Sequence, residues 1–121
     1  MIIVNVPLRK KLFGKAYFSH VDIPMEFKIG TLENLAEYFR VDLWNINEVL
    51  KNQTFDYNSE LLYQAYLLAC MRLYKRPEYT RDHASVWQEY LSARERDKIN
   101  SAITELYGKM AGKKGKKKDQ K

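Results

Sequence analysis

The chain has 121 residues, of which 45% are hydrophobic and 30% are charged, a composition typical of one globular domain. The net charge of +6 is uneven, because residues 109–121 hold seven lysines and one aspartate while residues 1–108 are neutral. A single cysteine excludes a fold that depends on an internal disulfide. The first residues have the wrong order of apolar and basic groups for a signal peptide, so a cytoplasmic protein is the simplest expectation.

The first quarter of the chain has the pattern of a small antiparallel sheet. Residues 2–6, 15–21 and 23–29 are rich in β-branched and aromatic side chains, and the third segment alternates apolar with polar residues. Pro7 and the basic cluster that follows it predict the end of the first strand. That cluster consists of Arg9, Lys10, Lys11 and Lys15.

Helical spacing begins near Thr31, a candidate N-cap, and Asp42 can cap a second short helix that reaches Leu50. Residues 35–50 also resemble a helix–turn–helix. However, Arg40 stands where that motif usually has glycine for a positive φ, and its second helix offers no Arg or Lys to DNA. Two short packed helices are therefore favoured, with a DNA-binding motif as the alternative.

Residues 58–75 form the stretch around which the chain is organised. They are apolar over most of a helical circumference, which predicts a buried central helix, and the proline at position 77 forbids its continuation. One narrow polar stripe holds Gln64, Arg72 and Lys75, with Leu68 in its middle. We predict that Leu68, Gln64 and Arg72 face a partner or a second copy. Trp44 is included in this predicted surface, and the alternative is that Leu68 is a core residue.

Two further helices are predicted over residues 82–91 and from residue 92 onward. Ser92 and Glu95 have the spacing of a capping box, and Gly108 is well placed to end the second helix. The expected fold is α+β and mostly α: a small N-terminal antiparallel β element followed by a bundle of about five helices around the central buried helix. Residues 1–108 are expected to form a single globular domain and residues 109–121 a disordered lysine-rich tail.

No pattern in the sequence indicates catalysis, a metal or a cofactor. His20 and His83 lie in unlike contexts, and neither has a partner at metal-ligand spacing. Glu60 and Arg72 bracket an apolar run that is too short to span a bilayer. Nucleic acid is not expected to bind except weakly, through the charge of the tail. The tail lysines concerned are Lys113, Lys114, Lys116, Lys117 and Lys118.

The order of these features resembles a known family. IGTLENLAEYFRVDL is followed by FDYNSELLYQAYLLAC, a PEYT loop, a helix with Trp87, and ITELYGKMAGKKGKKK. This order, over residues 15–118, is similar to the tail assembly chaperones of long-tailed bacteriophages and prophages, especially those of Bacteroidetes hosts.

The resemblance implies a non-enzymatic protein with a mostly helical fold and a small β element. Such proteins bind the tape measure protein, keep it soluble and help tail tube subunits assemble around it, and they tend to self-associate. In many members a programmed frameshift adds a second domain, and the GKKGKKK end suits a slip site. The alternatives are a small helix-turn-helix-like DNA-binding protein and a structural head–tail connector component.

Overall fold

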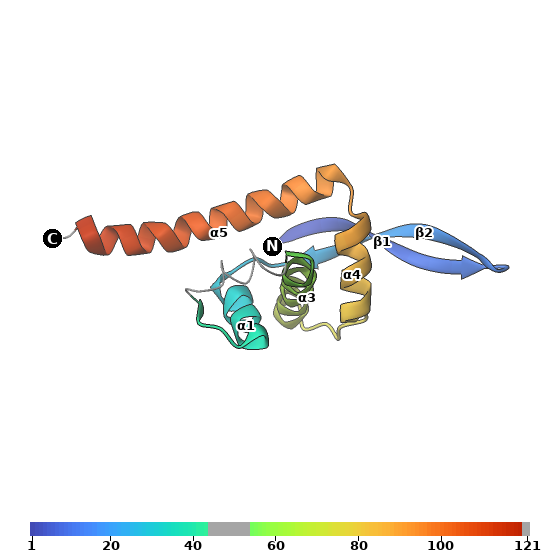
Figure 1. Ribbon diagram of the computed structural model, residues 1–121, viewed down its shortest axis with the longest axis horizontal. Coiled ribbons are helices and arrows are strands. Elements are labelled where there is room, and N and C mark those ends of the chain that lie inside the picture. The colour runs from blue at the N-terminus through green and yellow to red at the C-terminus, as the bar shows by residue number, and fades with distance from the viewer. Residues whose placement is uncertain (44–53, 120–121) are drawn as a thin grey trace.

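The computed structural model describes residues 1–43 and 54–119 (Figure 1). The elements are β1 (Ile2–Leu12), β2 (Lys15–Met25), α1 (Ile29–Phe39), α3 (Thr54–Arg72), α4 (Arg81–Tyr90) and α5 (Ala93–Asp119). The predicted α+β class with mostly helical content is confirmed, although the described residues contain four helices where about five were expected. The short helix expected over residues 42–50 falls largely outside the described residues.

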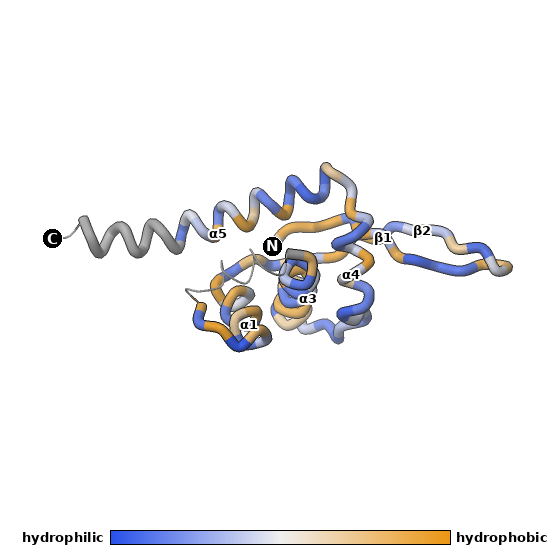
Figure 2. Tube along the Cα trace, in the orientation of Figure 1, coloured by the Kyte–Doolittle hydropathy of each residue, from blue (hydrophilic) through white to orange (hydrophobic). Residues whose placement is uncertain are grey.

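The two strands form one long hairpin instead of the three strands expected. They pair antiparallel along their whole length, from Ile2 opposite Met25 to Leu12 opposite Lys15. The turn residues Phe13 and Gly14 have φ of 54° and 79°, as a two-residue type I′ turn requires. The inner half of the hairpin lies beside the helices, and the outer half projects away from them (Figure 1). Figure 2 shows that the outer half of β1 is mainly hydrophilic.

Pro7 and Pro24 can lie inside strands because of the hairpin register. In a two-residue hairpin the pair that closes the turn, here Leu12 and Lys15, is hydrogen-bonded, and bonded pairs then alternate with non-bonded ones. This alternation places Pro7 and Pro24 at positions where an N–H would point away from the partner strand. The prediction that Pro7 ends the first strand is therefore wrong.

The strand expected over residues 23–29 ends at Met25 because a threonine starts the next helix. The Thr31 hydroxyl donates a hydrogen bond to the Glu26 carbonyl oxygen (2.7 Å) and accepts one from the Lys28 N–H (3.1 Å). These bonds turn the chain into α1 at Ile29. Thr31 thus lies in the first turn of α1 and not at its N-cap.

The central helix α3 is the buried centre of the fold, as predicted. One core cluster joins its residues to the sheet, α4 and the start of α5, and a second joins them to α1 and the middle of α5. Trp87 of α4 is fully buried in the first cluster. Its ring lies edge-on to those of Tyr66 and Tyr79, with centroids 5.7 and 5.8 Å away.

Helices α1 and α3 end in the same left-handed cap, formed without glycine. Arg40 has φ 56° and Tyr74 has φ 54°. After α1, Val41 N–H bonds to the Ala36 carbonyl (3.0 Å), the pattern of a Schellman motif. The equivalent bond after α3 runs from the N–H of residue 75 to the carbonyl of residue 70 (2.9 Å). The central helix therefore spans Thr54–Arg72 and not residues 58–75.

Helix α5 is tied to the free edge of β1. The Glu95 N–H donates to the Ser92 hydroxyl (3.3 Å), which is one half of the predicted capping box. The Glu95 carboxylate instead accepts a hydrogen bond from the Asn5 N–H (2.9 Å), which points away from β2. The glutamate therefore joins two elements that are distant in the sequence.

The predicted helix end at Gly108 is wrong, because α5 continues to Asp119. Within a helix a glycine costs only about 1 kcal/mol relative to alanine, and lysine is a good helix former. The globular domain over residues 1–108 and the disorder of residues 109–121 remain predictions.

Candidate functional site

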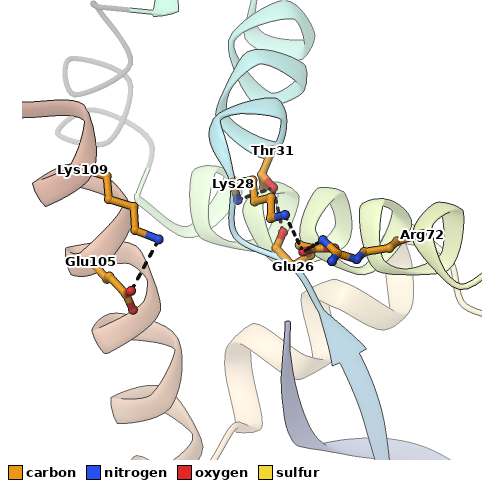
Figure 3. Close-up of polar contacts among 6 residues, drawn as sticks. All are labelled: Glu26, Lys28, Thr31, Arg72, Glu105 and Lys109. Atoms are coloured by element: carbon orange, nitrogen blue, oxygen red, sulfur yellow. Dashed lines mark hydrogen bonds and ion pairs between the residues drawn. The ribbon is translucent and has the colours of Figure 1, made fainter. Parts of the chain in front are cut away.

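Arg72, one of the predicted partner residues, bonds within the molecule. Its Nη1 donates to Glu26 Oε1 (2.7 Å), and Lys28 Nζ lies 3.2 Å from the same oxygen (Figure 3). Glu26 is 2% exposed, so the two cations offset the cost of burying its charge. The end of β2, the start of α1 and α3 are joined at this point.

Gln64 is bound to a second buried carboxylate. Its Nε2 donates to Glu60 Oε2 (2.6 Å), while Arg81 Nε of α4 donates to Glu60 Oε1 (2.8 Å). The guanidinium of Arg81 lies over the rings of Tyr38 and Tyr63, 4.9 and 4.8 Å from their centroids. The hydrogen bond that Arg81 donates to Glu60 raises the pKa of Arg81. Gln64 is buried, and its amide holds the carboxylate that binds Arg81 of α4.

Leu68 lies between these two ion pairs on α3 and is half-buried. The structure does not bring the predicted partner residues together as one free surface, because Gln64 and Arg72 bond internally. Trp44 lies outside the described residues. For Lys113, Lys114, Lys116, Lys117 and Lys118 the structure describes only the helical backbone of α5.

Three exposed apolar or aromatic side chains at the end of α3, close to Leu68 in the sequence, were missed from the sequence. Met71 is 71% exposed, Leu73 40% and Tyr74 97%. We call Leu68, Met71, Leu73 and Tyr74 the α3-end patch. The sequence pattern placed the last three on the buried side of a helix reaching residue 75. Because α3 ends at Arg72, Leu73 and Tyr74 lie beyond it, and Met71 is exposed within its last turn. The three-residue spacing of Leu68 and Met71, which makes them neighbours on a helix surface, was the sequence pattern that could have indicated this exposed group.

The buried tyrosines have structural roles. Burial, and then the hydrogen bond with the Tyr107 hydroxyl (3.0 Å), raise the pKa of Tyr57. Burial also raises the pKa of Tyr66, whose hydroxyl accepts N–H bonds from Glu78 (2.7 Å) and Tyr79 (3.3 Å). These bonds hold α3 against α5 and against the loop before α4.

His83 caps α4 by accepting at Nδ1 from the Thr80 N–H (3.0 Å). Among residues 1–43 and 54–119 no group of three His, Cys, Asp or Glu side chains could hold a metal ion. None of the helices in this part of the chain is long and apolar enough to cross a membrane.

A hollow of about 380 Å³ opens between α1, α3 and α4. It is lined by Tyr38, Phe39, Asp56, Ser59, Glu60, Arg81 and Ser85. The Ser59 hydroxyl is buried there without a hydrogen-bond partner. Its charged lining residues are Asp56, Glu60 and Arg81, and the last two are paired with each other.

Comparisons with known proteins gave no match to a family model, a curated protein or a solved structure.

Proposed function

We propose that this protein is a non-enzymatic tail assembly chaperone that binds the tape measure protein of a long-tailed phage and assists tail tube assembly in the host cytoplasm. The α3-end patch is the observation that carries the proposal. A protein that holds a long helical client needs exposed apolar surface, and an unbranched methionine adapts to varied contacts. The resemblance over residues 15–118 supplies the identity of the client.

The patch has the mixed character of a protein-binding surface. Met71 and Tyr74 are large, exposed and apolar or aromatic, and the Arg72–Glu26 ion pair lies at its edge. Binding surfaces commonly combine an apolar centre with a polar rim. A client helix would bury the patch while the ion pair stays at the border with solvent.

The test is co-expression with the tape measure protein encoded in the same phage or prophage genome. We expect the wild-type chain to keep that protein in the soluble fraction and to co-purify with it. Met71→Glu should weaken this effect, because a charge among these apolar side chains opposes their burial by a client. Phe55→Glu is the matched control, since Phe55 is also exposed (47%) on α3 but lies at its other end.

Insoluble tape measure protein in the presence of the wild-type chain would overturn the proposed function. Equal effects of the Met71 and Phe55 substitutions would mean that the α3-end patch is not the surface that binds the tape measure protein. The position of the gene between those of a major tail protein and a long coiled-coil protein would support the proposal independently.

A small DNA-binding protein is the second candidate, because Arg40 adopts φ 56° and ψ 46°. Arg40 therefore adopts the positive φ for which that motif usually has glycine. The second helix of that motif falls on residues outside the described ranges. Tight binding of a DNA duplex in ordinary salt by a chain truncated after Gly108 would favour this candidate over the chaperone.

A further inference from the structure

The outer half of the hairpin is a basic arm that the proposed function does not use. We define the arm as residues 9–18, every one of which is exposed. At its base Phe18 packs against Tyr90 of α4, with ring centroids 4.7 Å apart, and beyond this contact the arm extends away from the helices (Figure 1). The first acidic residue of the chain is Asp22, whereas the arm contains four basic residues. These are Arg9, Lys10, Lys11 and Lys15.

The basic residues lie on both faces of the arm. Opposite residues of a hairpin share a face, and successive residues of a strand alternate between the two faces. The strand register therefore places Lys10 and Lys15 on one face. It places Arg9 and Lys11 on the other. A flat acidic surface would meet only one of these faces, whereas a groove offers a wall to each of them.

The tip of the arm is apolar. Leu12 is 56% exposed and Phe13 is 95% exposed. Phe13 also has φ 54°, at a turn position that prefers Asn, Asp or Gly. An exposed aromatic ring in a disfavoured backbone conformation points to a contact with another molecule. The ligand that fits the arm offers negative charge along its two sides and apolar groups at its end.

The major groove of B-form DNA has this arrangement. It is about 12 Å wide and about 8.5 Å deep, it admits a two-stranded β-ribbon, and the thymine methyl groups lie on its floor. A strand rises about 3.3 Å per residue, so the depth of the groove corresponds to roughly three residues. With the turn at the floor, Arg9 and Lys10 come to the level of the phosphates. The major groove of an RNA duplex is too narrow for the same fit.

We propose that the arm inserts into the major groove of duplex DNA, with the cations of its two faces on the phosphates of the two strands and Phe13 against thymine methyl groups. Most of the affinity then comes from phosphates, so the binding has little sequence preference. The site is separate from residues 35–50 of the helix–turn–helix candidate and from the lysine-rich tail. The proposal does not depend on the proposed function, because it does not use the α3-end patch.

Two charge-matched variants of the full chain test the phosphate contacts. The arm variant has glutamine at its four basic positions. The tail variant has Lys113, Lys114, Lys116 and Lys117 changed to glutamine, and each variant lowers the formal net charge by four, from +6 to +2. Fluorescence anisotropy measures binding to a short labelled DNA duplex over a range of salt concentrations. Circular dichroism checks that both variants keep the wild-type fold.

We expect the arm variant to bind the duplex about tenfold or more weakly at about 0.1 M salt. Its slope of log affinity against log salt should be smaller by about 3 to 4, as for the loss of four phosphate contacts. The tail variant should change both quantities much less. An equal or larger loss in the tail variant would overturn the proposal, because the charge alone would then account for binding.

The contact of Phe13 with the groove floor is tested by changing both partners. Phe13→Asn removes the ring and suits a type I′ turn, so the hairpin should stay folded. We expect it to weaken binding about fivefold without changing the salt slope. A duplex with uracil in place of thymine should weaken wild-type binding similarly and Phe13→Asn binding no further. Phe55→Asn is the matched control, since Phe55 is an exposed ring on α3, and it should bind as the wild type does.

Other outcomes would assign the arm differently. A wild-type chain that does not bind the duplex at low salt would overturn the proposal, as would wild-type affinity that is unchanged by uracil. Full binding by the arm variant would move the DNA contact to the helix–turn–helix candidate. Polyglutamate that competes as well as DNA would assign the arm to an acidic protein instead.

Discussion

At the scale of single residues, Tyr74 carries backbone strain that its side chain does not offset. It has φ 54°, and its side chain is 97% exposed. We expect Tyr74→Gly to raise the free energy of unfolding by about 1 kcal/mol, because glycine adopts the left-handed conformation without a Cβ clash. Urea denaturation measures the change. Tyr74→Ala is the control and should give no such gain, because alanine keeps the Cβ.

Glu95 links stability to pH. Burial acts to raise its pKa, but the Asn5 N–H bond and Lys98 outweigh this, so the pKa of Glu95 lies below its ordinary value of 4.5. Its contribution to stability is thus present above pH 4.5 and is lost as the pH falls through the lower folded value. We expect Glu95→Gln to reduce stability at neutral pH and to make the thermal midpoint less sensitive to pH below about 4.5. An unchanged acid dependence would contradict this role.

At the scale of elements, a substitution of Leu68 tests whether this residue belongs to a partner surface or to the core. Because it is half-buried, a carboxylate at this position can remain in contact with water. We expect Leu68→Glu to leave a folded protein that binds its partner less, with a stability loss smaller than that of a buried charge. Thermal melting and light scattering measure the two effects. Leu62→Glu is the control for burial and should unfold the chain, since Leu62 is 1% exposed.

An unfolded or insoluble Leu68→Glu variant would assign Leu68 to the core and remove it from the partner surface.

The helices could be predicted from the sequence because their apolar spacing is local. The stripe of α5 that includes Ile99 and Leu106 is buried as expected, and α4 begins within one residue of its predicted start. The strands were less predictable, because Pro7 and Pro24 are tolerated only in this register, which depends on the pairing of both strands. The left-handed caps were not predicted, because Arg40 and Tyr74 stand at positions where such caps usually have glycine.

The polar stripe of α3 was visible in the sequence, but its partners were not. Gln64 and Arg72 are predicted correctly to share a face with Leu68. Their carboxylate partners come from the end of β2 and from within α3, and only the packing brings Glu26 and Arg72 together. Long-range ion pairs of this kind leave no local pattern in one sequence.

At the scale of the whole molecule, α5 packs on the rest of the fold through Leu106 and Tyr107. Leu106 is 5% exposed and the Tyr107 hydroxyl bonds to that of Tyr57. The Glu105–Lys109 pair joins two exposed residues of the same helix (Figure 3). We expect truncation after Gly108 to leave the thermal midpoint nearly unchanged. A large decrease would mean that residues 109–121 contribute to the packed domain.

Truncation after Ala102 is the matched control. It removes Leu106 and Tyr107 along with the tail and should lower the midpoint strongly, because it opens the second core cluster.

The edge of β1 also bears on how the chain behaves when concentrated. An open strand edge can template fibril growth, because each free N–H can donate a hydrogen bond to a carbonyl of a further strand. On the inner half of β1 the Asn5 N–H is held by Glu95, and the next outward position is Pro7, which has no N–H. Two successive positions therefore offer no donor to an incoming strand. One of the two positions depends on the Glu95 carboxylate. Protonation of Glu95 in acid would weaken its hold on the Asn5 N–H and should promote amyloid-like aggregation from this edge.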